Sequence, residues 1–171
     1  MSRVGSASTR LIIIRGNAGA GKSALAAAIR AALPRGVAII GHDQLRREIL
    51  HVRDYPGTPA AAYVDLSTRF ALDQGLHTVV EGIYHEEVYG PLFEQLISDH
   101  VGISRCYRYA LSFEETMRRH ATRPKAAEFG EAKMRTWWQE LGPLPGTDEA
   151  VIGADSSLAD SLRRVLADCS W

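Results

Sequence analysis

The sequence predicts an α/β fold in which helices cover a mainly parallel, five-stranded sheet. Short apolar runs alternate with longer amphipathic stretches along the 171 residues, which is typical of repeated strand–helix units. The first apolar run, residues 11–14, is unbroken and rich in isoleucine, as expected of a strand buried on both faces. A glycine-rich stretch then leads directly into an alanine-rich one, so a helix follows this strand.

The next elements continue the alternation. Alanines favour a helix over 22–33, and Pro34 ends it. The apolar run 37–40 predicts the second strand. After it, Asp43 can cap a short helix that has apolar residues at intervals of four and five.

A longer helix is expected after the turn at 55–57. Thr58 is placed to cap it, with proline at its first position, and it should end at Gly75. Tyr63, Leu66 and Phe70 share one face of this helix. Residues 76–80 predict the third strand.

The second half repeats the pattern. Gly90 and Pro91 are expected to open a helix, and residues 103–111 to form the fourth strand. Ser112 and Glu115 have the spacing of a capping box, so a helix should start there. The remaining elements are expected to be helices at 131–141 and 156–168 and a short strand at 150–152.

Length and composition favour one domain spanning 1–171, with a flexible segment at 1–10. The 20 basic and 20 acidic side chains cancel, so no overall field attracts nucleic acid or an anionic membrane. No apolar run approaches the length of a membrane span, and no secretory signal is visible. Two cysteines are too few for a disulfide framework. We therefore expect a soluble, cytoplasmic protein.

The glycine-rich stretch matches the pattern G-x-x-x-x-G-K-[ST] at every fixed position. Its residues are Gly16, Asn17, Ala18, Gly19, Ala20, Gly21, Lys22 and Ser23. Glycines let the backbone curl around a phosphate, and the following helix adds the positive end of its dipole. The lysine of this pattern reaches the terminal phosphates and the hydroxyl can ligate Mg²⁺. The stretch, a P-loop, predicts binding of a nucleoside triphosphate with Mg²⁺.

With this motif and three others in order, the chain resembles the P-loop kinases, in the group of polynucleotide 5′-kinases, zeta-toxin-like kinases and antibiotic phosphotransferases. The other motifs are residues 43–46 after the second strand, residues 79–82 ending the third, and residues 119–123 after the fourth, within an arginine-rich segment at 118–123. The resemblance implies a three-layer P-loop fold, ATP-dependent phosphoryl transfer and a short arginine-bearing lid over about 118–130.

Asp43 and Arg46 follow the second strand, at the sheet edge where parallel α/β proteins place ligands. The resemblance implies that Asp43 is the general base. It also implies that Arg46 contacts the acceptor or the transferred phosphate. The alternative is that Asp43 only caps the helix. Glu81 ends the third strand, where it could help hold Mg²⁺ or the acceptor. His85 follows and is a further candidate for acceptor binding.

The arginine-rich segment is expected to supply cations over the transferring phosphate. Arg119 and Arg123 are four residues apart, so they share a helical face that could close over the nucleotide. The alternative is a solvated basic turn in which Glu114 and Glu115 pair with nearby arginines. Arg123 is the stronger catalytic candidate, because Glu115 can pair locally with Arg119.

The sequence thus predicts an ATP- and Mg²⁺-dependent kinase that phosphorylates a hydroxyl of a metabolite, sugar, nucleoside or antibiotic. GTP remains possible, because no short adenine-reading motif is present. Two alternatives stay open: a polynucleotide 5′-hydroxyl kinase and a nucleotide-dependent switch. Residues 54–100 carry eight acidic and one basic side chain, which disfavours a polyanionic acceptor.

Overall fold

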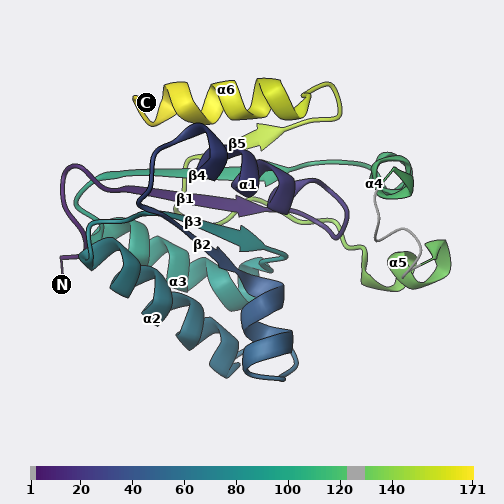
Figure 1. Cartoon of the computed structure of the whole chain (residues 1–171). Coiled ribbons are helices and arrows are strands. Elements are labelled where there is room, and N and C mark those ends of the chain that lie inside the picture. The colour runs from purple at the N-terminus through teal and green to yellow at the C-terminus, as the bar shows by residue number, and fades with distance from the viewer. Residues whose placement is uncertain (1–2, 123–129) are drawn as a thin grey trace.

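The computed structural model, which describes residues 3–122 and 130–171, has a five-stranded, fully parallel sheet at its centre (Figure 1). The strands are β1 (Arg10–Arg15), β2 (Val37–Gly41), β3 (His77–Gly82), β4 (Ile103–Tyr109) and β5 (Glu149–Ile152). Their order is β2-β3-β1-β4-β5. The predicted α/β architecture is therefore confirmed.

Helices cover both faces of the sheet and make three layers (Figure 1). One face carries α1 (Lys22–Ala32) and α6 (Leu158–Asp168), and the other carries α2 (Pro59–Asp73) and α3 (Glu86–Asp99). The central strand β1 supplies both cores by alternation: Ile12 and Ile14 pack on the α1 side, and Leu11 and Ile13 on the α2 side. All four are fully buried, which explains the unbroken apolar run.

The buried face of α2 is not the one that carries Leu66 and Phe70. Leu66 and Phe70 are 62% and 64% exposed. The buried residues are Ala60, Val64, Thr68, Ala71 and Leu72. Most of these side chains are small, so the helix can approach the sheet closely. Thr68 is tolerated there because its hydroxyl donates to the carbonyl of Val64.

Helix α3 begins at Glu86, earlier than expected, and contains Pro91 in its interior. A proline inside a helix costs about 3 kcal/mol. Burial of Tyr89, Phe93 and Leu96 on the same helix offsets this cost, because each contributes about 1.5–3 kcal/mol.

The described part of the N-terminal segment, which we expected to be flexible, is held by contacts. Val4 is 2% exposed and pairs with His100 next to the sheet. The Gly5 N–H donates to Asp73 Oδ1 at 2.8 Å.

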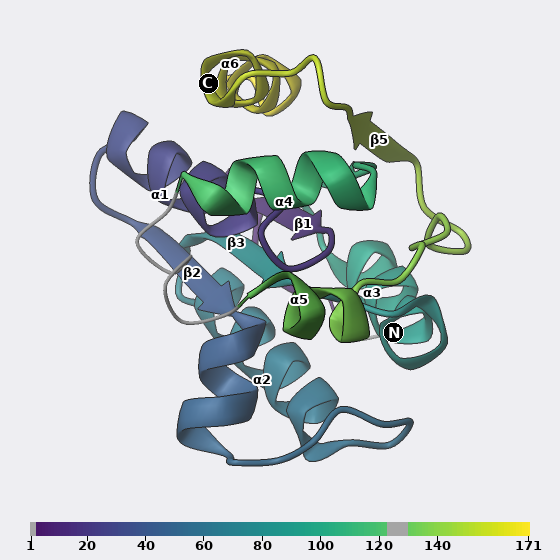
Figure 2. The same ribbon diagram turned by 90° about the vertical axis from the view of Figure 1, so that its right-hand side faces the viewer.

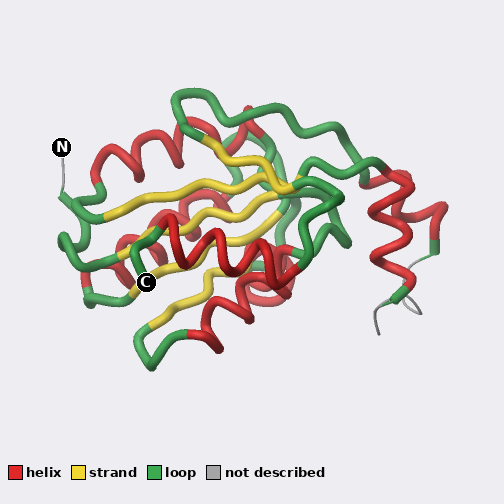
Figure 3. Tube along the Cα trace, turned by 90° about the horizontal axis from the view of Figure 1, so that it is seen from above, coloured by secondary structure: helices red, strands yellow, loops and turns green. Residues whose placement is uncertain are grey.

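Two helices lie beyond the carboxyl end of the sheet (Figures 2 and 3). They are α4 (Phe113–Ala121) and α5 (Glu131–Trp137). Ser112 caps α4 as predicted, because its hydroxyl accepts from the Glu115 N–H at 3.2 Å. No helix within residues 3–122 and 130–171 is long and apolar enough to cross a membrane.

Candidate active site

The P-loop joins β1 to α1, and its shape depends on glycine. Gly19 and Gly21 have φ angles of +80° and +123°, which strongly favour glycine. A Cβ on Gly16 would lie 2.8 Å from the Cβ of Tyr109, so the loop packs too closely on β4 for any side chain there. The loop therefore presents its backbone to a ligand, as a phosphate cradle requires.

The two side chains of the loop that the motif predicts to bind phosphate and Mg²⁺ have defined neighbours. Lys22 is only 8% exposed, and its ammonium donates to the Asn17 carbonyl at 2.8 Å. The Ser23 hydroxyl donates to Glu81 Oε1 at 3.0 Å. Hydroxyl and carboxylate oxygens are ligands that Mg²⁺ accepts when it also binds substrate phosphates. In residues 3–122 and 130–171 no group of three or more His, Cys, Asp or Glu side chains is placed to hold a metal ion.

A cavity of about 670 Å³ opens above the P-loop and brings most of the predicted residues together. The predicted side chains that line it are Lys22, Ser23, Asp43, Arg46, Glu81 and His85. Ala18, Gly19 and Gly21 contribute the loop wall. Residues on three successive strand ends thus face one space, as the parallel topology requires.

Asp43 lies immediately before η1, a short π-helix (Gln44–Ile49), and it does not cap that helix. Its backbone is helical, and its side chain makes no capping hydrogen bond to the described residues. The carboxylate is 67% exposed, and its Oδ1 lies 3.5 Å from Arg46 Nη2. Arg46 also donates to the Val52 carbonyl at 3.3 Å, which holds its guanidinium near Asp43. The capping alternative for Asp43 has no support in this geometry.

Three further residues, His42, Tyr89 and Asp54, form a hydrogen-bonded group next to Asp43 and Arg46. The buried His42 contacts the Tyr89 hydroxyl at 2.7 Å, and that hydroxyl donates to Asp54 Oδ1 at 2.8 Å. Burial alone would raise the pKa of Asp54, but the hydrogen bonds of His42 and Tyr89 outweigh it and hold this pKa below its ordinary value. His42 and Asp54 both line the cavity. The only sequence signal was the position of His42 beside Asp43.

Arg119 lies on α4 and contacts the P-loop. It donates to Glu115 Oε1 at 2.7 Å and to the carbonyls of Ala20 and Ala154, at 3.3 Å and 3.0 Å. The local pairing with Glu115 is therefore present, and Arg119 is not among the described residues that line the cavity. It bridges the P-loop to the loop after β5. Arg123 lies outside the described residues.

Helix α5 and the segment after it form the far wall of the cavity. Met134, Thr136, Trp137 and Gln139 line it, and Trp137 is 37% exposed. Trp138 instead packs against Phe113, with ring centroids 6.1 Å apart. One tryptophan therefore faces the cavity and its neighbour packs between helices.

The fold of this chain is similar to the folds of several solved kinase structures. The chain resembles a gluconokinase from Sinorhizobium meliloti 1021 with a TM-score of 0.66 and 20% identity, over 99% of this chain and 94% of that one. It resembles the Mycobacterium tuberculosis APS kinase in complex with AMPPNP and APS with a TM-score of 0.73 and 16% identity, over 99% of both chains. A weaker likeness, with a TM-score of 0.57 and 13% identity, covers 80% of this chain and 43% of a chain in the Pnkp1/Rnl/Hen1 RNA repair complex.

The zeta toxin family model matches residues 4–84, which include the P-loop, Asp43 and Glu81. No curated protein matches the sequence. The predicted resemblance to the P-loop kinase group is confirmed.

Proposed function

We propose that this protein is an ATP- and Mg²⁺-dependent kinase that transfers the γ-phosphate to a hydroxyl group of a small molecule. The observation that carries the proposal is the single cavity in which the P-loop side chains Lys22 and Ser23 face the same space as Asp43 and Arg46. A P-loop alone binds a nucleotide. A carboxylate and a guanidinium in the same cavity supply a proton acceptor and a positive charge for the hydroxyl of an acceptor.

Phosphoryl transfer depends mostly on positioning and charge stabilisation. Asp43 accepts the acceptor's hydroxyl proton while the oxygen–phosphorus bond forms and the bond to the ADP leaving oxygen breaks. Lys22 stabilises charge on the terminal phosphates, and Arg46 holds Asp43 and faces the acceptor. Ser23 and Glu81 would hold Mg²⁺, which would neutralise charge on the β- and γ-phosphates.

Charge in the cavity favours a small acceptor over a polynucleotide. Four carboxylates line it: Glu81 beside the P-loop, and Asp43, Glu48 and Asp54 around Arg46 and Arg47. A polynucleotide that entered the cavity would bring its phosphates close to these carboxylates. The repulsion between the negative charges would weaken its binding, which depends on phosphate contacts. The likeness to the RNA repair complex keeps the polynucleotide acceptor as the alternative to be tested.

A transfer screen tests the proposal. Purified protein with Mg²⁺ and γ-labelled ATP, and in parallel γ-labelled GTP, is incubated with pools of sugars, nucleosides, aminoglycosides and metabolites, and separately with single-stranded oligonucleotides. We expect label on a small molecule and none after chelation of Mg²⁺. Lys22→Met should abolish transfer, while Arg30→Met, which removes an exposed charge on the same helix, should not.

Two other outcomes would contradict the proposal. Label on the oligonucleotide alone would identify a polynucleotide kinase. Hydrolysis of ATP with no labelled acceptor in any pool would favour a nucleotide-dependent switch.

A further inference from the structure

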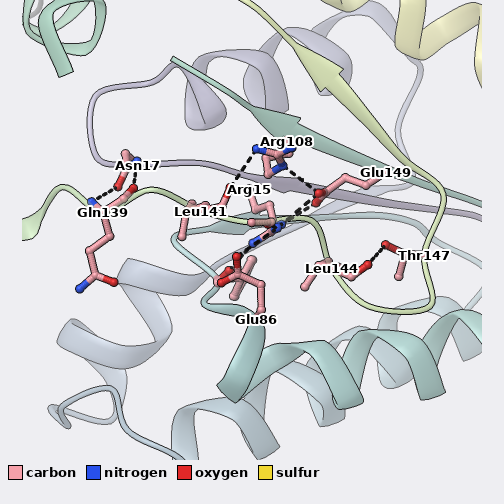
Figure 4. A network of polar contacts seen from close by, with 11 residues as sticks. Arg15, Asn17, Glu86, Arg108, Gln139, Leu141, Leu144, Thr147 and Glu149 are labelled. Carbon is pink, nitrogen blue, oxygen red and sulfur yellow. Dashed lines mark hydrogen bonds and ion pairs between the residues drawn. The ribbon is translucent and has the colours of Figure 1, made fainter. Parts of the chain in front are cut away.

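Asn17 belongs to the P-loop, but its side chain points away toward the chain that follows α5 (Figure 4). Its Nδ2 donates to the Gln139 carbonyl at 2.6 Å, and the Gln139 N–H donates to its Oδ1 at 3.1 Å. Asn17 is 6% exposed, so this double contact is shielded from water. The side chain therefore binds one residue, Gln139, at both its backbone N–H and its backbone carbonyl.

The same stretch of chain is held at two more carbonyls. Arg108 of β4 donates to the Leu141 carbonyl at 2.9 Å, and Arg15 of β1 donates to the Gly142 carbonyl. Both guanidiniums also bind Glu149 of β5, Arg108 at 2.9 Å (Figure 4). An irregular segment with three carbonyls held by side chains of the sheet and the P-loop is tied to the sheet, although it has no regular structure of its own.

This segment forms part of the cavity wall that lies opposite the P-loop. Gln139 lines the cavity, as does Trp137 two residues before it. Arg15 also donates to the Tyr84 carbonyl at 2.8 Å, beside the cavity residue His85. The residues on the two sides of Gly16 thus hold two walls of the cavity.

The backbone of Asn17 links its contact with Gln139 to Lys22, the P-loop lysine. The Lys22 ammonium, which a P-loop directs at the terminal phosphates, donates to the Asn17 carbonyl at 2.8 Å. A triphosphate in the loop attracts that ammonium and so changes the contacts of the residue whose side chain holds Gln139.

From these contacts we propose that Asn17 is a positioning residue, which sets the wall formed by Trp137 and Gln139 relative to the P-loop and thereby couples nucleotide binding to the shape of the acceptor cavity. The inference rests on the proposed function. Asn17 acts through Gln139 and touches no reacting atom. Coupling between two such sites typically changes affinity by about 5- to 150-fold.

The test uses Trp137 as a reporter. The sequence has three tryptophans, so Trp138→Phe with Trp171→Phe leaves Trp137 as the only one. This reporter protein is titrated with Mg²⁺ and AMPPNP while its emission is recorded, and labelled nucleotide binding is measured by equilibrium dialysis. We expect an emission change that saturates at the nucleotide concentrations that saturate dialysis.

Asn17→Ala in the reporter should keep nucleotide affinity within about threefold and lose the emission change. Thr147→Val is the matched control, because it removes only a hydrogen bond of 3.0 Å to the Leu144 carbonyl within the loop before β5. It should keep both. Once an acceptor is known, Asn17→Ala should raise its KM about tenfold or more with the nucleotide KM unchanged.

Four results would overturn the inference and are distinguishable. Nucleotide binding without any emission change in the reporter removes the coupling, and an undiminished change in Asn17→Ala removes the role of Asn17. Loss of nucleotide affinity in Asn17→Ala assigns the side chain to the nucleotide instead. No nucleotide binding to the unaltered protein would overturn the proposed function itself.

Hydrogen exchange on the unaltered protein gives a second readout if Asn17→Ala does not fold. Nucleotide should change exchange of the Gln139 amide, whose proton Asn17 accepts. An unchanged rate at saturating nucleotide would refute the coupling.

Discussion

Replacing Asp43 by asparagine separates chemistry from stability at the candidate site. The side chain is two-thirds exposed, and its contact with Arg46 spans 3.5 Å. An exposed ion pair of this kind is worth about 0–1 kcal/mol. Because Asp43 makes no cap to the described part of η1, no further loss is expected, and the free energy of unfolding should fall by less than about 1 kcal/mol.

The rate of transfer should respond far more strongly. Asparagine cannot accept the acceptor's proton, and loss of a general base costs about 10²- to 10⁴-fold. Nucleotide binding depends on the P-loop and should survive. Initial rates with labelled ATP and the acceptor from the screen, dialysis with labelled nucleotide and urea unfolding measure the three quantities.

Glu48→Gln is the matched control. Glu48 lies on η1, is exposed and lines the same cavity, so this substitution removes an equal charge from the same wall. Its transfer rate should stay within about tenfold of the unaltered protein, well short of the loss expected for a general base. A near-normal rate in Asp43→Asn, or equal losses in both variants, would refute the assignment of Asp43 as base and leave Glu81 as the next candidate.

The remaining predictions concern three other positions and one pH effect. Ser23→Ala should raise the Mg²⁺ concentration for half-maximal rate more than the nucleotide Kd; an unchanged Mg²⁺ requirement would contradict the site with Glu81. Arg123→Ala should lower kcat far more than it raises the nucleotide KM, since a lid cation acts mainly in the transition state; equal losses of ADP and ATP affinity with kcat intact would mark a ground-state contact. Lys22→Ala should abolish transfer with an unchanged circular dichroism spectrum, and wild-type turnover would exclude the P-loop assignment. Burial, helped by the charge of Arg10, lowers the pKa of His100 to about 4. Because the unfolded chain takes up this proton more readily, the contribution of His100 to the free energy of unfolding is complete above about pH 6.5. It should fall by up to roughly 3 kcal/mol as the pH drops toward 4. Urea unfolding at pH 7 and 4.5 measures the fall, and His100→Gln should reduce it.

The strands and the P-loop could be predicted because their signals are local. The run 11–14 has no polar residue, so only a strand buried on both faces accommodates it. The glycines at 19 and 21 occupy positive φ angles that the motif requires. Residues that are neighbours in the sequence determine such features, so the sequence alone predicts them.

The rest depended on contacts between distant segments. Helix α2 offered two faces at helical spacing, and the close approach to the sheet selected the one with Val64 and Ala71 rather than Leu66 and Phe70. Asp54 reaches His42 only because a loop returns beneath η1. The grip of Asn17 on Gln139 spans 122 positions, and no spacing rule predicts it.

The sharing of Glu149 between Arg15 and Arg108 has a consequence for how the chain folds. Glu149 lies on β5, which follows the other four described strands in the sequence, and Arg15 is fully buried. Until β5 docks, Arg108 lacks the Glu149 carboxylate, and Arg15 keeps, among the described residues, only the longer ion-pair contact of 4.0 Å to Glu86. Removing one partner of a buried ion pair costs about 3–5 kcal/mol. That is a large share of the roughly 5–15 kcal/mol that stabilises a domain. Truncation before residue 149 should therefore lower the free energy of unfolding by several kcal/mol, because it removes the carboxylate that both guanidiniums share.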